Sequence, residues 1–242
     1  MISSVVAMID HSVLQPTATD ADVREACRLC REVGVASICV KPCHVPLAAA
    51  ELAGSAVKVS TVIGFPHGGA SSAIKAAETR TACDEGAQEV DMVANLGKAV
   101  AGDWSYVEAD IRAVVEAARA HGAITKVIFD TGLLPNDDVK IGLCRASEAA
   151  GAAFVKTSTG YGYAKNAAGE MQATGATEHD VRLMRATCSP AIQVKASGGI
   201  RDFATASRFV ELGATRLGTS STLAIAAGER GGAAAPATTS AY

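Results

Sequence analysis

The fold is decided within residues 89–130, which read EVDMVANLGKAVAGDWSYVEADIRAVVEAARAHGAITKVIFD. A short β-branched run lies around Met92, an Ala-rich stretch with helical periodicity follows it, and a second β-branched run lies around Ile128. Buried runs of this kind are typical of parallel strands, and the helical stretch is typical of the helices that cover them. The segment therefore predicts a strand, a helix and a second strand, which together form a βαβ unit.

The same alternation extends outward in both directions along the chain. Short β-branched or apolar runs lie near Ile9, Cys39, Val62, Met92, Ile128, Val155, Val194 and Leu217. Eight strand–helix units in 242 residues predict an α/β fold, a single (β/α)8 or TIM barrel. The alternative is an open doubly wound sheet, but no G-x-G-x-x-G motif follows the first run. We place the barrel domain at residues 1–227 and a flexible tail, rich in small residues, at residues 228–242.

Composition and charge exclude several classes of protein. The formal net charge of -3 offers no basic excess for a nucleic-acid partner. No apolar run approaches the roughly 20 residues that a membrane span needs, and the first residues lack the basic flank and cleavage site of a signal peptide. Seven cysteines, an odd number scattered through a long chain, indicate free thiols in a reducing compartment. We therefore expect a cytoplasmic protein with neither a nucleic-acid nor a membrane partner.

Ionisable residues interrupt the strands where a barrel tolerates them least. They are Asp91, Lys126, Asp130, Lys156 and Lys195. An unpaired charge in a barrel interior would cost several kcal/mol, and most of these residues fall toward the C-terminal ends of their strands, where barrel active sites lie. Lys126 and Asp130 share one parity, so we expect them to face the same way. A structural ion network would explain one such charge, but lysines on adjacent strands with acids beside them indicate a catalytic site.

The acid–base chemistry of lysine suggests a catalytic function for these charged residues. A free lysine has a pKa near 10.4, so at pH 7 few molecules carry the neutral amine that attacks a carbonyl carbon. A second cation and desolvation both lower that pKa, and neighbouring strands lie about 4.8 Å apart, which brings Lys156 and Lys195 within range of each other. We predict that one lysine is a Schiff-base nucleophile and the other its electrostatic activator, with Asp91 shuttling protons.

Three motifs predict a phosphate site at the same end of the barrel. Barrels often hold phosphate on the loops after the seventh and eighth strands, and here those loops read SGGIR and GTSST. Glycine lets backbone N–H groups approach an anion closely, and a helix N-terminus favours negative charge. Ordinary turns and caps would explain each motif alone, but their shared position favours phosphate. The candidate ligands are Gly198, Gly199, Ser220 and Ser221, joined by Ser158 and Gly160 after Lys156.

The segments FVKTSTG, VKASGGIR, EVDMVANLG, VIGFPHG, KVIFDTGLL and RLGTSST together resemble the deoxyribose-phosphate aldolase family, over roughly residues 5–225. The resemblance implies an aldehyde-lyase that reversibly cleaves 2-deoxy-D-ribose 5-phosphate to D-glyceraldehyde 3-phosphate and acetaldehyde, in deoxyribose phosphate catabolism. It implies no metal and no organic cofactor. The partners it implies are small phosphosugar and aldehyde substrates.

The resemblance also implies roles for individual residues. Lys156 matches the Schiff-base lysine, Lys195 the activating lysine and proton relay, and Asp91 the proton donor and acceptor. Substrate-binding positions are matched by Asp10 and Cys39, and we expect Lys126 and Ser158 to bind substrate as well. Phosphate-binding positions of the family are matched by Gly160, Gly198, Gly199, Ser220 and Ser221.

Three features depart from the common family pattern or lie beyond it. Asp130 stands where the fifth strand usually carries Glu, and the loop after Lys156 is several residues longer than in compact members. The chain ends in Tyr242 on a Gly/Ala-rich tether, and we hypothesise that this tyrosine assists proton transfer to the enamine; a disordered end is the alternative. Barrels of this size are often dimers, so a homodimer is possible.

Two other functions compete with this interpretation. A lysine-dependent barrel aldolase of the transaldolase or fructose-bisphosphate type would use a ketone donor. A non-catalytic phosphate-binding barrel would use the lysines as phosphate ligands and would form no borohydride-trappable adduct. The histidines show no metal-ligand spacing, so we expect no metal site.

Overall fold

The computed structural model describes residues 4–165 and 168–231, and within them eight parallel strands close into a barrel. The strands follow one another around the barrel in the order β1, β2, β3, β4, β5, β6, β9, β10. Their bounds are β1 Ile9–Val13, β2 Ser37–Val40, β3 Lys58–Ile63, β4 Glu89–Val93, β5 Ile124–Ile128, β6 Phe154–Lys156, β9 Gln193–Ser197 and β10 Arg216–Thr219. Each of the eight predicted runs lies on one of these strands, so the barrel prediction is confirmed.

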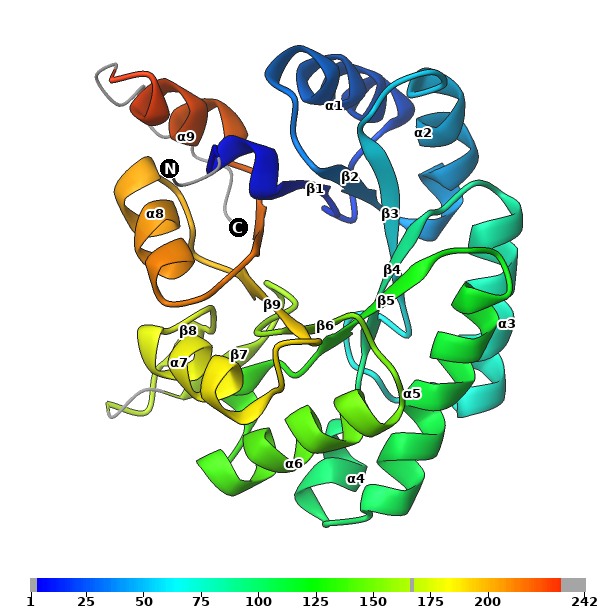
Figure 1. The fold of residues 1–242 in the computed structure, drawn as a ribbon, viewed down its shortest axis with the longest axis vertical. Helices are drawn as coiled ribbons and strands as arrows, with labels where there is room; N and C mark the ends of the chain where they lie inside the picture. Colours follow the sequence, from blue (N-terminus) through cyan, green and yellow to red (C-terminus); the bar gives the residue numbers. More distant parts are fainter. Residues whose placement is uncertain (1–3, 166–167, 232–242) are drawn as a thin grey trace.

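Helices surround the strands and bury their outer faces (Figure 1). Their bounds are α1 Asp20–Val33, α2 Val45–Glu51, α3 Ser72–Asp84, α4 Leu96–Val100, α5 Trp104–Arg119, α6 Asp137–Ala149, α7 Glu178–Thr187, α8 Phe203–Glu211 and α9 Thr222–Glu229. Short 3-10 turns lie at η1 Val6–Met8, η2 Pro42–His44 and η3 Thr131–Leu133. None of the described helices is long and apolar enough to cross a membrane.

Local sequence signals begin and end these helices. Thr19 and Asp22 form a capping box at the start of α1, in which each side chain accepts from the other residue's backbone N–H. Gly34 ends the helix in the left-handed conformation that a residue without a Cβ adopts most readily. Between these ends, Val23, Ala26 and Cys30 recur at helical spacing and pack into the core.

Strand register places the charged side chains in the barrel interior. Lys156 on β6 lies opposite Lys195 on β9, and Asp91 on β4 lies opposite Lys126 on β5. Because side chains alternate along a strand, Val90 and Met92 on either side of Asp91 face the surrounding helices and join the apolar core. The inward layer is therefore polar and the outward layer apolar.

Asp130 lies beyond the end of the strand to which the parity argument applies. The strand β5 ends at Ile128, and Asp130 adopts a left-handed conformation with φ 49°. Its carboxylate accepts hydrogen bonds from the backbone N–H and the hydroxyl of Thr159, at 3.1 Å and 3.0 Å. The parity argument does not extend to Asp130, because alternation holds only while the chain remains a strand, so its orientation relative to Lys126 stays a prediction.

The first described residues contact the last described helix. Helix α9 continues to Glu229, two residues beyond the predicted end of the barrel domain at 227. The Glu229 carboxylate accepts hydrogen bonds from the Val5 backbone N–H at 2.6 Å and the Ser4 hydroxyl at 2.8 Å, so this turn belongs to the barrel. Tyr242 and the rest of the predicted tail after residue 231 lie outside the described residues.

The long segment after β6 contains a small hairpin. Strands β7 Tyr163–Lys165 and β8 Met171–Ala173 pair antiparallel outside the barrel. The Thr174 backbone N–H donates to the Gly162 carbonyl at 2.8 Å and continues the pairing toward the barrel. The extra length that the sequence shows after Lys156 is therefore ordered as strands on both sides of the undescribed residues 166 and 167.

Candidate active site

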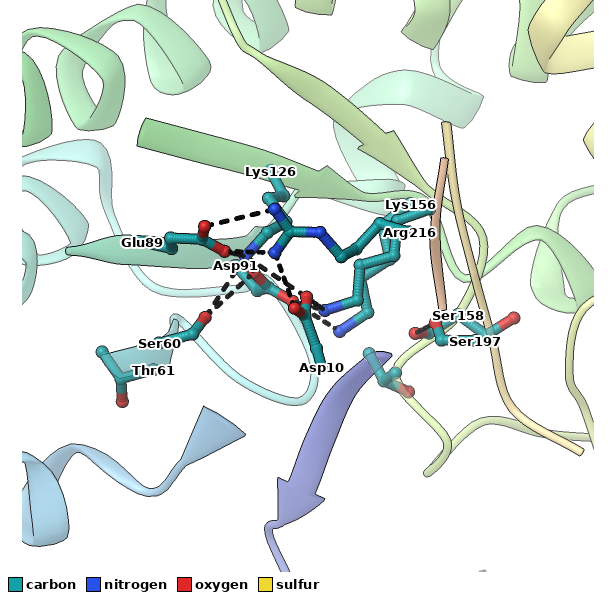
Figure 2. A network of polar contacts seen from close by, with 12 residues as sticks. Asp10, Ser60, Thr61, Glu89, Asp91, Lys126, Lys156, Ser158, Ser197 and Arg216 are labelled. Atoms are coloured by element: carbon teal, nitrogen blue, oxygen red, sulfur yellow. Dashed lines mark hydrogen bonds and ion pairs between the residues drawn. The ribbon is translucent and has the colours of Figure 1, made fainter. Parts of the chain in front are cut away.

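Seven charged residues converge inside the barrel. All are buried except Arg216, whose side chain is 15% exposed. Figure 2 shows the acidic side chains reaching toward the cations of β5, β6 and β10. The group, which we call the interior charge network, consists of Asp10 on β1, Glu89 and Asp91 on β4, Lys126 on β5, Lys156 on β6, Lys195 on β9 and Arg216 on β10.

Asp91 is the centre of this network. One carboxylate oxygen, Oδ2, accepts from Lys156 Nζ at 2.9 Å and from Lys195 Nζ at 2.7 Å. The other oxygen, Oδ1, accepts from Lys126 Nζ at 2.7 Å. Burial alone would raise the pKa of Asp91, but the three ammonium groups outweigh it and hold the pKa well below its usual range. Asp91 is therefore ionised at neutral pH.

Asp10 on β1, which β10 separates from β9, also binds Lys195. Its Oδ2 accepts from Lys195 Nζ at 2.5 Å, and its Oδ1 accepts from Arg216 at 2.6 Å and from the Ser37 hydroxyl at 2.6 Å. Burial opposes ionisation, but the cations around Asp10, led by Lys195, lower its pKa below the ordinary value. Lys195 is consequently fixed between two carboxylates.

The two lysines of adjacent strands differ in their proton affinity. Burial lowers the pKa of Lys156, Asp91 opposes that change, and the neighbouring Lys195 lowers the pKa further. Burial also disfavours the charged form of Lys195, but Asp10 and Asp91 raise its pKa above the ordinary value. The network thus distinguishes a lysine that loses its proton readily from one that keeps it.

Lys126 lies deeper than either of these lysines. Its Nζ contacts Glu89 at 2.7 Å and Asp91 at 2.7 Å and donates to the Ser60 hydroxyl at 3.2 Å. Burial works against its charge, yet Asp91, Asp10 and Glu89 raise the pKa of Lys126 above the ordinary value. The side chain is fully buried and does not line the pocket described next. Its predicted contact with substrate stays a prediction that this geometry does not support directly.

A pocket of about 550 Å³ opens above the network at the C-terminal ends of the strands. Of the seven network residues, Lys156 is the one that lines it. Four of the predicted phosphate ligands also line it, namely Gly160, Gly198, Gly199 and Ser220. The pocket therefore joins an amine of lowered pKa to a wall formed by three of the predicted glycines and Ser220, and phosphate binding at this wall stays a prediction.

The two remaining predicted phosphate-binding residues, Ser158 and Ser221, do not line the pocket themselves. Ser221 precedes α9 as its N-cap, and its backbone N–H donates to the Thr219 hydroxyl at 2.9 Å. Ser158 is fully buried, and its hydroxyl has no partner among the described atoms. Gly198 is required by packing as well as by conformation, because it has φ 89° and a Cβ there would lie 2.9 Å from Gly175 Cα.

Tyr161 forms one side of the pocket. Its hydroxyl donates to the Leu14 carbonyl at 2.6 Å, and its ring meets the Phe65 ring edge-on, with centroids 5.4 Å apart. These contacts join the segment after β6 to the segments after β1 and β3. Tyr161 belongs to the long loop after Lys156, and nothing in the sequence predicted this bridge.

Cys39 lies in the barrel interior on β2, as predicted for a position near the site. The thiol is fully buried, and burial raises its pKa above the ordinary value, so it is a neutral group beside the network. All seven cysteines are free thiols. Among the described residues, no group of three or more His, Cys, Asp or Glu side chains could hold a metal ion.

Sequence analysis missed three parts of this site. Glu89 and Arg216 belong to the network although neither was singled out, and Gly218 makes room for Lys195, because a Cβ there would lie 3.1 Å from Lys195 Cε. The parity of Glu89 with Asp91 could have revealed the first of these. The contact of Glu89 with Arg216 joins β4 to β10 across the barrel, which no local pattern encodes.

The fold and the site together define a (β/α)8 barrel with a lysine-centred catalytic pocket at the C-terminal ends of its strands. The chain belongs to the DeoC/LacD family of aldolases, whose model matches residues 4–228. This family assignment confirms the resemblance seen in the sequence.

Individual relatives agree with this assignment. The chain is 47% identical over 232 residues to the deoxyribose-phosphate aldolase of Carboxydothermus hydrogenoformans, covering 94% of this chain and 97% of the relative. It is 46% identical over 222 residues to that of Clostridium perfringens, covering 92% and 94%. Among solved structures, the deoxyribose phosphate aldolase of Aeropyrum pernix, described as a tetramer, matches with a TM-score of 0.83 at 31% identity, covering 93% of this chain and 91% of the other.

Proposed function

We propose that this chain is a class I aldolase that reversibly cleaves 2-deoxy-D-ribose 5-phosphate to D-glyceraldehyde 3-phosphate and acetaldehyde, through a Schiff base on Lys156. The observation that carries the proposal is the contrast between the buried lysines of the barrel. Lys156 lines the pocket and has a lowered pKa, whereas Lys126 and Lys195 are enclosed by carboxylates and have raised pKa values. The names of the relatives support the substrate, and catabolism of deoxyribose phosphates is the corresponding role in the cell.

The first step is attack of the neutral Lys156 amine on the aldehyde carbon, C1, of the open-chain sugar. A carbinolamine forms, and its hydroxyl leaves as water after taking a proton from the Lys195 ammonium. The product is a cationic Schiff base on Lys156 and a neutral Lys195 amine. Lys195 suits this role because its raised pKa keeps it protonated at the start, and it shares an oxygen of Asp91 with Lys156.

The second step breaks the bond between C2 and C3. The neutral Lys195 amine, directly or through a water molecule, accepts the proton of the C3 hydroxyl. The bonding electrons move into the Schiff base and form an enamine, and glyceraldehyde 3-phosphate leaves as the C3 aldehyde. Lys195 then gives a proton to C2 and becomes neutral. Water hydrolyses the resulting cationic Schiff base to acetaldehyde and the neutral Lys156 amine, and the proton that this releases returns to Lys195.

Asp91 holds the two lysines together through this cycle. Its pKa lies well below the usual range, so the carboxylate carries no proton to donate at neutral pH. We therefore assign it the acceptor half of the predicted donor and acceptor role. It positions Lys195 beside Lys156 and stabilises each ammonium group as the proton moves.

The phosphate end of the substrate lies at the wall formed by the loops after β6, β9 and β10. Gly160, Gly198 and Gly199 have positive φ values, and their backbone N–H groups with the Ser220 hydroxyl suit a phosphate dianion. The N-terminus of α9, with Ser221 at its cap, adds the positive end of a helix dipole. Ser158 offers a further hydroxyl behind this wall.

The proposal also includes four expectations that come from the sequence alone. They are assistance by Tyr242 in enamine protonation, substrate contacts of Asp10, Cys39 and Lys126, a cytoplasmic location, and association into a homodimer. Light scattering of the purified chain measures the last of these. A mass of one subunit would exclude the dimer.

An assay of both products tests the proposed reaction. With deoxyribose 5-phosphate, we expect acetaldehyde and glyceraldehyde 3-phosphate in equal amounts, and Lys156→Ala should abolish both while retaining the fold measured by circular dichroism. The matched control is Lys98→Ala, which removes a half-exposed lysine paired with Asp103 on the barrel's outside and should leave the rate unchanged. Cleavage of fructose 1,6-bisphosphate instead would overturn the choice of an aldehyde donor.

A further inference from the structure

A pair of charged residues lies beneath the catalytic lysines and takes no part in the chemistry proposed above. Arg216 Nη1 contacts Glu89 Oε2 at 2.7 Å and Asp10 Oδ1 at 2.6 Å. The Arg216 guanidinium also lies over the Phe154 ring, 5.2 Å from its centroid. Neither Arg216 nor Glu89 lines the pocket, so neither is placed to touch substrate there.

The interior charge network has more basic than acidic side chains. The interior charge network holds three carboxylates, namely Asp10, Glu89 and Asp91. It holds four basic side chains, namely Lys126, Lys156, Lys195 and Arg216. If all seven were ionised, the buried network would carry one excess positive charge. It is neutral when one of the four basic groups has lost its proton, and a neutral buried network is the less costly state.

The contacts decide which basic group is neutral. Arg216 cannot lose its proton in a protein. Lys126 lies within 4.0 Å of three carboxylates, and Lys195 lies that close to two. Lys156 contacts Asp91 alone. The group with the fewest counterions is thus the one that also opens into the pocket.

No other described charge faces the Lys156 amine from the barrel strands. Strand β2 contributes Cys39, whose buried thiol is neutral, and β3 contributes the hydroxyl of Ser60, which donates to Asp91 at 3.5 Å. Strands β1, β4, β5, β9 and β10 contribute the six other network residues already named. Beyond the strands, Asp130 after β5 also acts on Lys156: burial raises the pKa of its carboxyl group and Lys156 lowers it. Thr159 holds that carboxylate through hydrogen bonds of 3.1 Å and 3.0 Å, and among the described residues Asp130 forms no ion pair with the network lysines, so the balance of the direct ionic contacts is set within the network.

We propose that Arg216, with Glu89 as its partner, is a positioning residue that sets the proton balance of the network and so keeps Lys156 as the neutral amine. The inference rests on the proposed function of Lys156. Arg216 is suited to this task because its guanidinium stays charged across the pH range of the reaction. It acts through Asp10, which it holds against Lys195.

Two substitutions that change the network charge in opposite directions distinguish this role from a purely structural one. Arg216→Met removes one positive charge and retains packing on Phe154, so Lys156 should hold its proton more tightly. Glu89→Gln removes one negative charge and should have the reverse effect. A unit charge about 10 Å away changes a pKa by roughly one unit at an effective dielectric constant of about 20. The double variant restores neutrality and should return Lys156 to its wild-type behaviour.

The measurement is the rate of borohydride trapping with acetaldehyde as a function of pH. We expect the midpoint of its acid limb to rise by roughly one pH unit in Arg216→Met, to fall by a similar amount in Glu89→Gln, and to return in the double variant. Arg216→Lys, which keeps the charge at neutral pH, should stay near the wild-type midpoint. Thermal melting of each variant gives an independent measure of folding.

Midpoints that shift in the same direction in both single variants, or that do not shift, would overturn the role of Arg216. A double variant further from wild type than either single variant would do the same, since structural damage accumulates whereas charges cancel. Failure of the wild-type chain to form any adduct with acetaldehyde would instead overturn the proposed function, which the inference presupposes.

Discussion

Replacing Lys195 by methionine removes the cation closest to Lys156 without filling the pocket. Both Nζ atoms contact Asp91 Oδ2, at 2.7 Å and 2.9 Å, so they can be no more than 5.6 Å apart. At an effective dielectric constant of about 20, two unit charges at that separation repel each other by about 3 kcal/mol, which corresponds to about two pKa units. The Lys156 pKa should rise by that amount in Lys195→Met, and at any pH below both pKa values the neutral amine should become about 100-fold scarcer.

Borohydride trapping with acetaldehyde measures this effect, because the trapped species requires attack by the neutral amine. On the acid limb of the pH profile, where most Lys156 is protonated in both proteins, we expect the trapping rate of Lys195→Met to be about 100-fold lower, with a midpoint about two pH units above that of the wild type. Lys98→Met, which removes a lysine on the outer surface, should behave as wild type. A lower rate in Lys195→Met with an unchanged midpoint would refute electrostatic activation and would leave Lys195 as a proton donor alone.

Three further variants test other parts of the account. Gly198→Ala places a Cβ 2.9 Å from Gly175 Cα at φ 89°, so it should raise KM for deoxyribose 5-phosphate far more than KM for unphosphorylated deoxyribose; equal changes in both would argue against a phosphate site there. Tyr161→Phe loses the hydrogen bond to the Leu14 carbonyl, worth about 1 kcal/mol, and should raise KM several-fold with kcat unchanged; a change in kcat alone would contradict a binding role. Burial lowers the pKa of His11 from 6.5 to about 4, so the unfolded chain takes up a proton first as the pH falls, and stability is lost between these two values, by up to about 3 kcal/mol. His11→Gln should flatten the dependence of the urea midpoint on pH in that window, and an unchanged slope would show that other groups cause it.

The fold was predictable because its signal is repeated. Eight apolar runs alternate with helical stretches, and each run found its strand in the barrel. The boundary at 227 was less accurate, since the contacts of Glu229 with Ser4 and Val5 are not visible in the sequence. Glu229 extends the barrel domain because it binds the backbone of Val5 at the other end of the chain.

The site was predictable to the extent that single strands encode it. Lys156, Lys195 and Asp91 are charges where apolar residues belong, and the register brings all three together. Parity could not predict the orientation of Asp130, because β5 ends at Ile128 and Asp130 itself is left-handed. The role of Arg216 was not predicted because it depends on contacts with Asp10 and Glu89, which lie on other strands.

The hairpin after β6 was not predicted from the sequence, for a third reason. Its sequence contains the turn residues and apolar positions of two short strands, but no pairing partner is visible until the register of Tyr163 with Ala173 is known. Tyr161, at its base, bridges the loops after β1 and β3 through one hydrogen bond and one ring contact. Bridges of this kind depend on where loops meet, which is settled by the barrel as a whole.

The central claim is that Lys156 is the covalent nucleophile. The direct measurement is to incubate the protein with acetaldehyde or deoxyribose 5-phosphate, reduce the mixture with borohydride, and locate the adduct by peptide mass spectrometry. We expect the acetaldehyde adduct as an ethyl group on Lys156, absent from Lys156→Ala. Attachment to Lys195, or no adduct with either compound, would contradict the account.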